Sequence, residues 1–214
     1  MRSLTAPDRW LALLLAALAG YVDSLGFLHL GGVFVSFMSG NSTRLAVSLA
    51  EGRWQAAGPV GGVLALFVLG AMLGALVAGG EGARSRSRVL AVEAFLLGGA
   101  AVAAGAGIAP VAIGLMVMAM AVENSVFLRD GEVGVSLTYM TGTLVKTGHA
   151  LAAAVRGGDP WAFRPYMALW AGLAGGALLG AAAYHGVGLI ALWPAAGFAL
   201  ILSVVTRISR APSL

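Results

Sequence analysis

The sequence predicts an all-α polytopic membrane protein, and three observations support that fold class. The chain has 214 residues, of which 59% are hydrophobic and 10% are charged, whereas a soluble domain carries about 25% charged residues. Its mean hydropathy is +0.91. Apolar runs recur along the chain and approach the roughly 20 residues that a helix needs to cross a bilayer. These runs are continuous rather than alternating, which excludes a β-barrel.

The charge balance fits a membrane protein as well. A net charge of +4 is typical of arginines gathered at the cytoplasmic rim, so we expect the lipid bilayer as a partner and no nucleic acid. The chain has no cysteine, which excludes disulfides and thiolate-bound metals. His29, His149 and His185 are scattered and lack the spacing of metal ligands. We therefore expect neither a metal nor another cofactor.

Apolar stretches punctuated by Gly, Pro and charged residues predict four helices in the first half of the chain. They are expected at about 10–29, 34–51, 60–79 and 88–106. The first stretch contains Ala17-Leu18-Ala19, which is similar to a signal-peptidase site. Because the apolar run continues to about Leu30, we interpret it as a retained first helix.

Four further helices are expected in the second half. They lie at about 109–128, 135–155, 165–184 and 188–206. The chain should therefore form a single membrane domain over 1–214, made of one half at about 8–107 and another at about 108–210.

Three blocks of the first half recur in the same order in the second half. They are "YVDSLGFL" (21–28) with "AVENSVFL" (121–128), "MSGNSTR" (38–44) with "MTGTLVK" (140–146), and "LGAMLGA" (69–75) with "GGALLGA" (175–181). The first two pairs carry the argument, because acids, hydroxyls and bases recur in register. The pattern indicates an internal repeat and hence two pseudo-symmetric halves.

The polar segments 34–51 and 135–155 allow two topologies. If both are re-entrant, six spans remain and the halves are inverted; if both cross, there are eight spans in one orientation. With six spans and a cytoplasmic N-terminus, Arg53 is the basic residue left outside, apart from Arg44 and Lys146 within the polar segments. Eight spans would move the "ARSRSR" loop outside. The positive-inside rule therefore favours six spans plus two polar re-entrant helices, with eight full spans as the alternative.

Glycines spaced by four residues predict close helix packing. They are Gly70 with Gly74, and Gly172 with Gly176 and Gly180. Small residues at this spacing let helix backbones approach closely in membranes. We expect them to serve packing within the chain, and a homodimer through these glycine-rich helices is the alternative.

Each half places an acid late in its first helix and a base midway along its polar helix. These are Asp23 with Arg44, and Glu123 with Lys146. Ionisable residues within a span mark functional sites, because burying them is costly. The same residues could instead form buried pairs that only fix helix packing. Glu93, a weaker candidate, is expected to pair with Arg88 near the membrane interface.

A small polar cluster lies between the acid and the base of each half. It consists of Ser39, Asn41 and their neighbours in the first half, and of Thr141 and Thr143 in the second. Its hydroxyl and amide groups can satisfy backbone groups that a helix break frees. Broken polar helices at matching positions of two repeats are the best sequence indication of a transporter site.

The stretch "GYVDSLGFLHLGGVFVSFMSGNSTRLA" resembles the YoaK-like family of small bacterial inner-membrane proteins, a domain of unknown function. The similarity covers nearly the whole chain and includes a Gly-x-x-Asp helix, Met-(Ser/Thr)-Gly-Asn and a second Thr-Gly element near residue 141. This chain has Thr143 where the family commonly has Asn. The resemblance implies a multi-pass protein of the bacterial plasma membrane and implies no substrate.

The leading functional hypothesis is a small secondary transporter or permease for a small anionic or zwitterionic metabolite. The solute would bind between the halves to Ser39, Asn41, Arg44, Thr141, Thr143 and Lys146. Asp23 and Glu123 would orient the bases or carry coupling protons. The alternative is a non-transporting assembly or accessory protein whose buried polar pairs are structural. No familiar catalytic set is visible, so we do not expect an enzyme.

Overall fold

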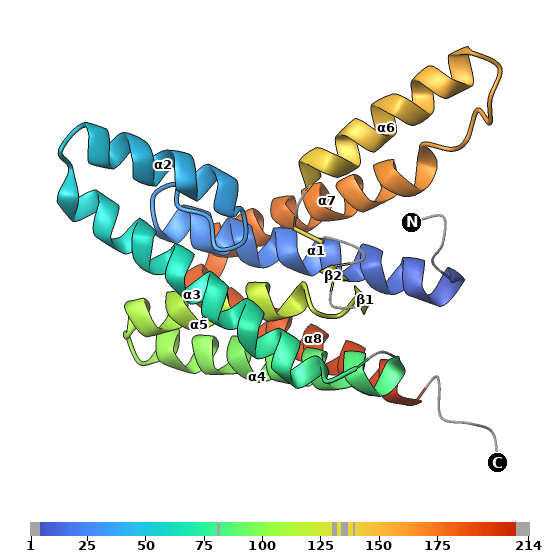
Figure 1. The fold of residues 1–214 in the computed structure, drawn as a ribbon. Helices are drawn as coiled ribbons and strands as arrows, with labels where there is room; N and C mark the ends of the chain where they lie inside the picture. Colours follow the sequence, from blue (N-terminus) through green and yellow to red (C-terminus); the bar gives the residue numbers. More distant parts are fainter. Residues whose placement is uncertain (1–4, 81, 130–131, 134–136, 139, 209–214) are drawn as a thin grey trace.

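The computed structural model describes residues 5–80, 82–129, 132–133, 137–138 and 140–208, and these residues form a helical bundle (Figure 1). Its helices are α1 (Ala6–His29), α2 (Met38–Ala50), α3 (Trp54–Ala78), α4 (Ala83–Gly105), α5 (Ala109–Glu123), α6 (Met140–Val155), α7 (Arg164–Val187), the short 3₁₀ turn η1 (Gly188–Ala191) and α8 (Leu192–Ile208). Two-residue strands, β1 (Leu128–Arg129) and β2 (Glu132–Val133), pair antiparallel between α5 and α6. The expected helical fold class is confirmed.

The expected helices are found in order, but several of their ends differ. The third begins at Trp54 rather than near residue 60, so Pro59 lies inside the helix, where it removes one intrahelical hydrogen bond. The fifth ends at Glu123, well before residue 128. The last begins at Leu192 rather than near residue 188. Gly188 has a φ of +62°, which ends α7 and separates it from α8.

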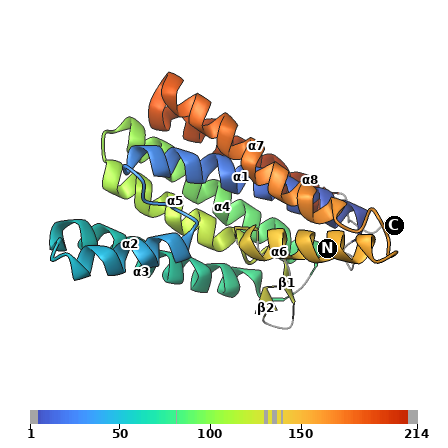
Figure 2. The same ribbon diagram turned by 90° about the horizontal axis from the view of Figure 1, so that it is seen from above.

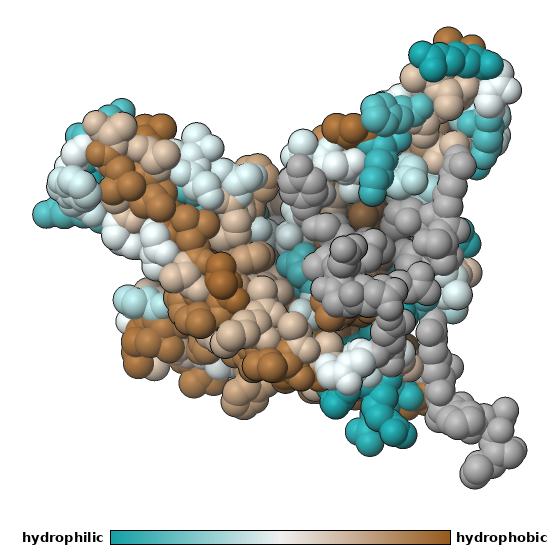
Figure 3. Space-filling model, viewed as in Figure 1, coloured by the Kyte–Doolittle hydropathy of each residue, from teal (hydrophilic) through white to brown (hydrophobic). Residues whose placement is uncertain are grey.

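Four described segments are long and apolar enough to cross a membrane. They are Ala6–His29, Trp54–Ala78, Ala83–Gly105 and Arg164–Ile208, the last of which contains both α7 and α8. Large apolar side chains such as Phe95 (80% exposed) and Leu76 (72% exposed) point outward, and Figure 3 shows apolar residues along much of one face. Such a surface suits lipid rather than water.

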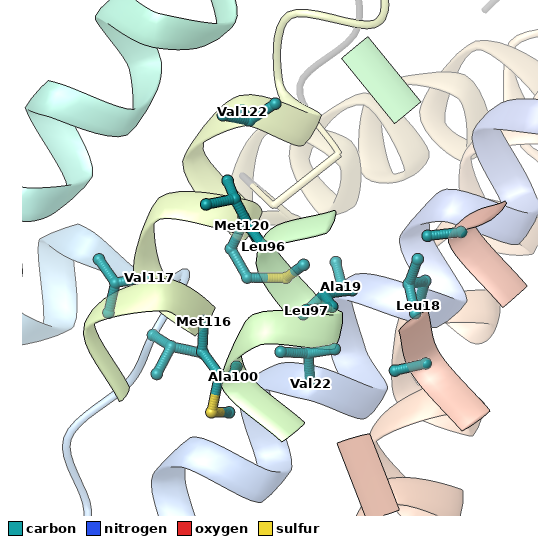
Figure 4. Packing of buried hydrophobic residues seen from close by; sticks show 14 of the residues in the cluster. Leu18, Ala19, Val22, Leu96, Leu97, Ala100, Met116, Val117, Met120 and Val122 are labelled. Atoms are coloured by element: carbon teal, nitrogen blue, oxygen red, sulfur yellow. The ribbon is translucent and has the colours of Figure 1, made fainter. Parts of the chain in front are cut away.

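Six helices, among them the 15-residue α5, run along one common direction in alternating senses. α1, α4 and α7 run one way, and α3, α5 and α8 run the other (Figures 1 and 2). The core lies where α1, α4 and α5 meet, with Val22, Leu97, Met116 and Met120 fully buried (Figure 4). In contrast, α2 and α6 are short and extend away from each other toward opposite ends of the molecule (Figure 1).

Glycines allow two pairs of parallel helices to approach closely. On α7, a Cβ at Gly176 would overlap the carbonyl oxygen of Ala17 on α1. On α3, a Cβ at Gly70 would lie 2.8 Å from the carbonyl oxygen of Met118 on α5. The expected internal use of these glycines is therefore observed. A homodimer stays a prediction, and it would have to use surfaces other than these buried contacts.

We expect Gly176→Ala to destabilise the protein by about 1–3 kcal/mol, because the added methyl forces α1 and α7 apart. Gly175→Ala is the matched control, since a Cβ there meets no atom within 4 Å. Thermal unfolding of both variants in detergent measures the difference. Equal melting temperatures would contradict the close α1–α7 contact.

Candidate functional site

The segment between α1 and α2 turns back into the bundle. α1 ends at His29, and Gly31 and Gly32 take positive φ angles of 62° and 101°, which favour glycine. Val35 then packs against Gly26, three residues before the end of α1. As a result, α2 begins well inside the molecule and runs outward again (Figure 1).

Asp23 holds this returning segment, residues 30–37, which we call the first loop. Its Oδ1 accepts hydrogen bonds from the backbone N–H groups of Val35 and Ser36, each at 2.8 Å. Both N–H groups belong to a chain section without helical hydrogen bonds. The carboxylate therefore supplies partners that these N–H groups would otherwise lack inside the bundle.

Asn41 and Arg44 of α2 hold the same loop from its other side. Asn41 is fully buried, and its side chain accepts from Phe34 N at 3.0 Å and donates to Phe34 O at 2.7 Å. The guanidinium of Arg44 donates to the carbonyl oxygens of Gly32 at 2.8 Å and Gly31 at 3.2 Å. The proposed Asp23–Arg44 ion pair is wrong, because both side chains bind loop backbone instead.

The second half has a similar arrangement built on a different residue. Asn124 follows the end of α5 and accepts a hydrogen bond from the Thr138 hydroxyl at 3.3 Å across the α5–α6 connection. It thus resembles Asp23, which holds Ser36 just before α2. The sequence matched Asp23 with Glu123, whereas the structure gives the comparable position to the next residue. Both residues occur in "VENS", so the sequence alone does not choose between them.

The side chains of α6 follow the pattern of α2. Thr143 is buried like Asn41, while Thr141 and Lys146 are exposed like Ser39 and Arg44. Glu123 is fully buried, and its two oxygens have no hydrogen-bond partner among the described residues. The proposed Glu123–Lys146 pair is therefore wrong.

Sequence reasoning underestimated Glu93. It is completely buried on α4 rather than lying at an interface. Arg88, its expected partner, donates instead to the carbonyl oxygen of Ala78 at 2.8 Å. The sequence around Glu93 does not indicate this burial, because the burial depends on how α4 packs against α5 and α8.

The first turns of α2 and α6 face one another across the middle of the molecule (Figures 1 and 2). Ser39 and Thr141 are exposed there. Phe37, the residue before α2, makes no side-chain capping bond, and the first N–H groups of a helix lack intrahelical partners. The positive end of the α2 dipole is thus directed at this central region.

A cavity of about 770 Å³ lies farther along α2. The first loop, α2 and the start of α3 line it, and its polar lining comes from Thr43, Arg44, Ser48 and Arg53. Arg53 also forms an ion pair with Glu51. Two guanidinium groups on one cavity can bind an anion, because each presents several fixed donors.

Comparison with known proteins gives a family but no activity. The family model described as a protein of unknown function (DUF1275) matches residues 11–205. A UPF0700 transmembrane protein of Rhizobium meliloti (strain 1021) is 32% identical over 186 residues, which is 87% of this chain and 80% of the relative. No solved structure matches. The resemblance to a membrane family of unknown function is confirmed.

We expect Asn41→Ala to destabilise the protein by about 1–3 kcal/mol, because both backbone groups of Phe34 lose their partner. Ser42→Ala is the matched control, since Ser42 is exposed and donates only to Met38 O of its own helix at 2.8 Å. Hydrogen exchange should accelerate across residues 31–37 in the Asn41 variant alone. Unchanged exchange there would show that Asn41 does not hold the loop.

Proposed function

We propose, from the premise that this chain belongs to the DUF1275 family of proteins of unknown function, that it is a small secondary transporter or permease. It is a multi-pass membrane protein, as its helices and the transmembrane relative indicate. The observation that carries the proposal is the pair of short helices α2 and α6, whose first turns face one another mid-molecule (Figure 1). Discontinuous helices in matching positions of two repeats form the substrate sites of known transporter folds.

The proposed topology has six crossing helices, namely α1, α3, α4, α5, α7 and α8, with α2 and α6 re-entrant from opposite faces. Their alternating directions support this topology (Figures 1 and 2). Positive-inside counting puts the start of α1 in the cytoplasm of a bacterium, with the protein in its plasma membrane. The two halves are then inverted relative to one another.

Matched contacts support the inverted repeat. Gly176 and Gly180 of α7 pack on Ala17 and Tyr21 of α1. In the same manner, Gly70 and Gly74 of α3 pack on Met118 and Val122 of α5. The third helix of each half therefore contacts the first helix of the other half. Such exchanged contacts are expected if one ancestral unit was duplicated.

The central region would bind a small anionic or zwitterionic metabolite. Helix N-termini and the exposed hydroxyls of Ser39 and Thr141 offer donors, and Arg44 and Lys146 lie about one turn farther along each helix. This arrangement favours a carboxylate or phosphate group. Asn41 and Thr143, which are buried on α2 and α6, would form the inner wall of the site. Asp23 would orient the first loop. No enzymatic reaction is proposed.

One observation favours the alternative of a non-transporting assembly or accessory protein. Asp23, Asn41 and Arg44 all bind the backbone of the first loop, which is a sufficient structural role for each. Lys146 distinguishes the two functions, because no ion pair is found for it among the described residues and it is exposed. A purely structural role for the polar residues does not explain why Lys146 is charged, whereas solute binding does.

We expect residues 51 and 159 to face opposite sides of the membrane, because α2 and α6 are re-entrant from opposite faces. The chain has no cysteine, so Glu51→Cys and Asp159→Cys can each be labelled singly against an unlabelled parent. A membrane-impermeant maleimide on intact cells should modify the first, and should modify the second only after permeabilisation. Labelling of both from one side would support eight full spans.

We expect Lys146→Gln to raise the apparent KM for a transported anion about 10-fold or more, because a lost charge-assisted bond costs about 1.5–3 kcal/mol. Uptake of radiolabelled acetate, succinate and alanine into proteoliposomes provides the assay. Arg156→Gln, an exposed cation just past α6, should leave uptake unchanged. No uptake of any solute by folded wild type would favour the accessory role.

A further inference from the structure

Two glutamates from adjacent helices lie at nearly the same level inside the bundle. Glu93 lies midway along α4 and Glu123 ends α5. Both are fully buried, and they are similarly far from the turn at residues 106–108 that joins these two antiparallel, packed helices. None of their four oxygens has a hydrogen-bond partner among the described residues. From the sequence, Glu123 is a candidate proton carrier and Glu93 a weaker candidate paired with Arg88, and nothing in the sequence brings these two acids together.

The residues one helical turn from each glutamate along α4 and α5 are apolar. Leu90 and Leu97 lie one turn on either side of Glu93 along α4, and Met120 lies one turn before Glu123; all three are fully buried. Figure 4 shows Leu97 and Met120 in the packed interior between α4, α5 and α1. An ionised carboxyl group in such a place costs several kcal/mol unless a cation accompanies it.

The described charged and titratable groups on the neighbouring helices have other partners or lie at helix ends. Neither α3 nor η1 contains such a group. On α4, Arg86 binds Asp8 of α1 and lies 5.0 Å from the Phe127 ring, and Arg88 binds Ala78 O. The remaining groups are Tyr21, which donates to Ala191 O, Asp23, which binds the first loop, and Arg9, His29, Arg84 and Arg207 near helix ends.

Two adjacent negative charges in this environment would repel one another without compensation. At least one carboxyl group must therefore keep its proton, as in carboxyl pairs that share one proton. Release of that proton becomes favourable only when water or a cation reaches the pair. α4 and α5 lie in the proposed span region, next to helices of both halves, so a movement of one half against the other would change that access.

We propose that Glu93 and Glu123 together form the proton-binding site that couples solute movement to a proton gradient. This inference rests on the proposed transport function. In each cycle a proton is taken up by the carboxylate of the pair from one side and released as a hydronium ion to the other. No bond other than O–H forms or breaks, and no electron is transferred.

Infrared spectroscopy of the reconstituted full-length protein tests proton binding without any substrate. Wild type should show a protonated carboxyl band at neutral pH that shifts in D₂O. The double variant Glu93→Gln/Glu123→Gln should lose it, because a single variant leaves one buried acid to hold the proton, whereas Glu51→Gln, a change at an exposed glutamate, should retain it. A band that is absent from wild type, or is unchanged in the double variant, would overturn the proposal. Absence of the wild-type band overturns it even if the double variant misfolds.

Transport in the same proteoliposomes tests the coupling. With acetate, succinate and alanine as probes, an inwardly directed proton gradient should stimulate uptake in wild type and in Glu51→Gln. In the double variant the ratio of gradient-driven to gradient-free uptake should fall to unity. Persistent stimulation in the double variant, or stimulation by a sodium gradient instead, would overturn proton coupling. If wild type moves none of the probes, the proposed transport fails, while the carboxyl band still decides whether the pair binds a proton.

Discussion

The structure depends on one constraint, which is that backbone groups inside a bilayer need partners within the protein. A helix meets this requirement by itself, but the first loop does not, because residues 30–37 run back into the bundle without helical bonds. Asp23, Asn41 and Arg44 supply the missing partners from α1 and α2. The polar residues of this apolar stretch are thus explained by the backbone that they stabilise.

This constraint links the fold to the proposed function. Once the loop is held, α2 can begin in the middle of the molecule and direct its first turn at α6 (Figure 2). Close glycine contacts join Gly176 of α7 to α1 and Gly70 of α3 to α5, and α3 and α7 are the helices on which the short α2 and α6 pack. Ser39 and Thr141 are then exposed at the region proposed to bind a solute. Asp23 and Asn41 hold the backbone, whereas Ser39 and Thr141 are the exposed hydroxyls that a ligand would meet in the proposed site.

Much of this architecture could be predicted from the sequence, and the exceptions have physical reasons. Hydropathy located the helices, and the repeated polar blocks identified α2 and α6 as unusual. Sequence reasoning failed on pairing, because opposite charges suggest ion pairs, whereas Asp23 and Arg44 bind loop backbone. It also missed Asn124 and the burial of Glu93. Both depend on the register and contacts of separate helices, which periodicity within one helix does not contain.

Measuring how deeply the first turns of α2 and α6 lie in the bilayer tests the proposed central site most directly. Nitroxide labels at Ser39→Cys and Thr141→Cys can be introduced into a chain that has no native cysteine. Collision rates with oxygen and with a water-soluble nickel complex report label depth, and dipolar spectroscopy of the double variant reports the separation. We predict that both labels lie near the bilayer midplane and close to each other. Labels at headgroup depth, or on opposite membrane surfaces, would contradict re-entrant helices that meet at a central site.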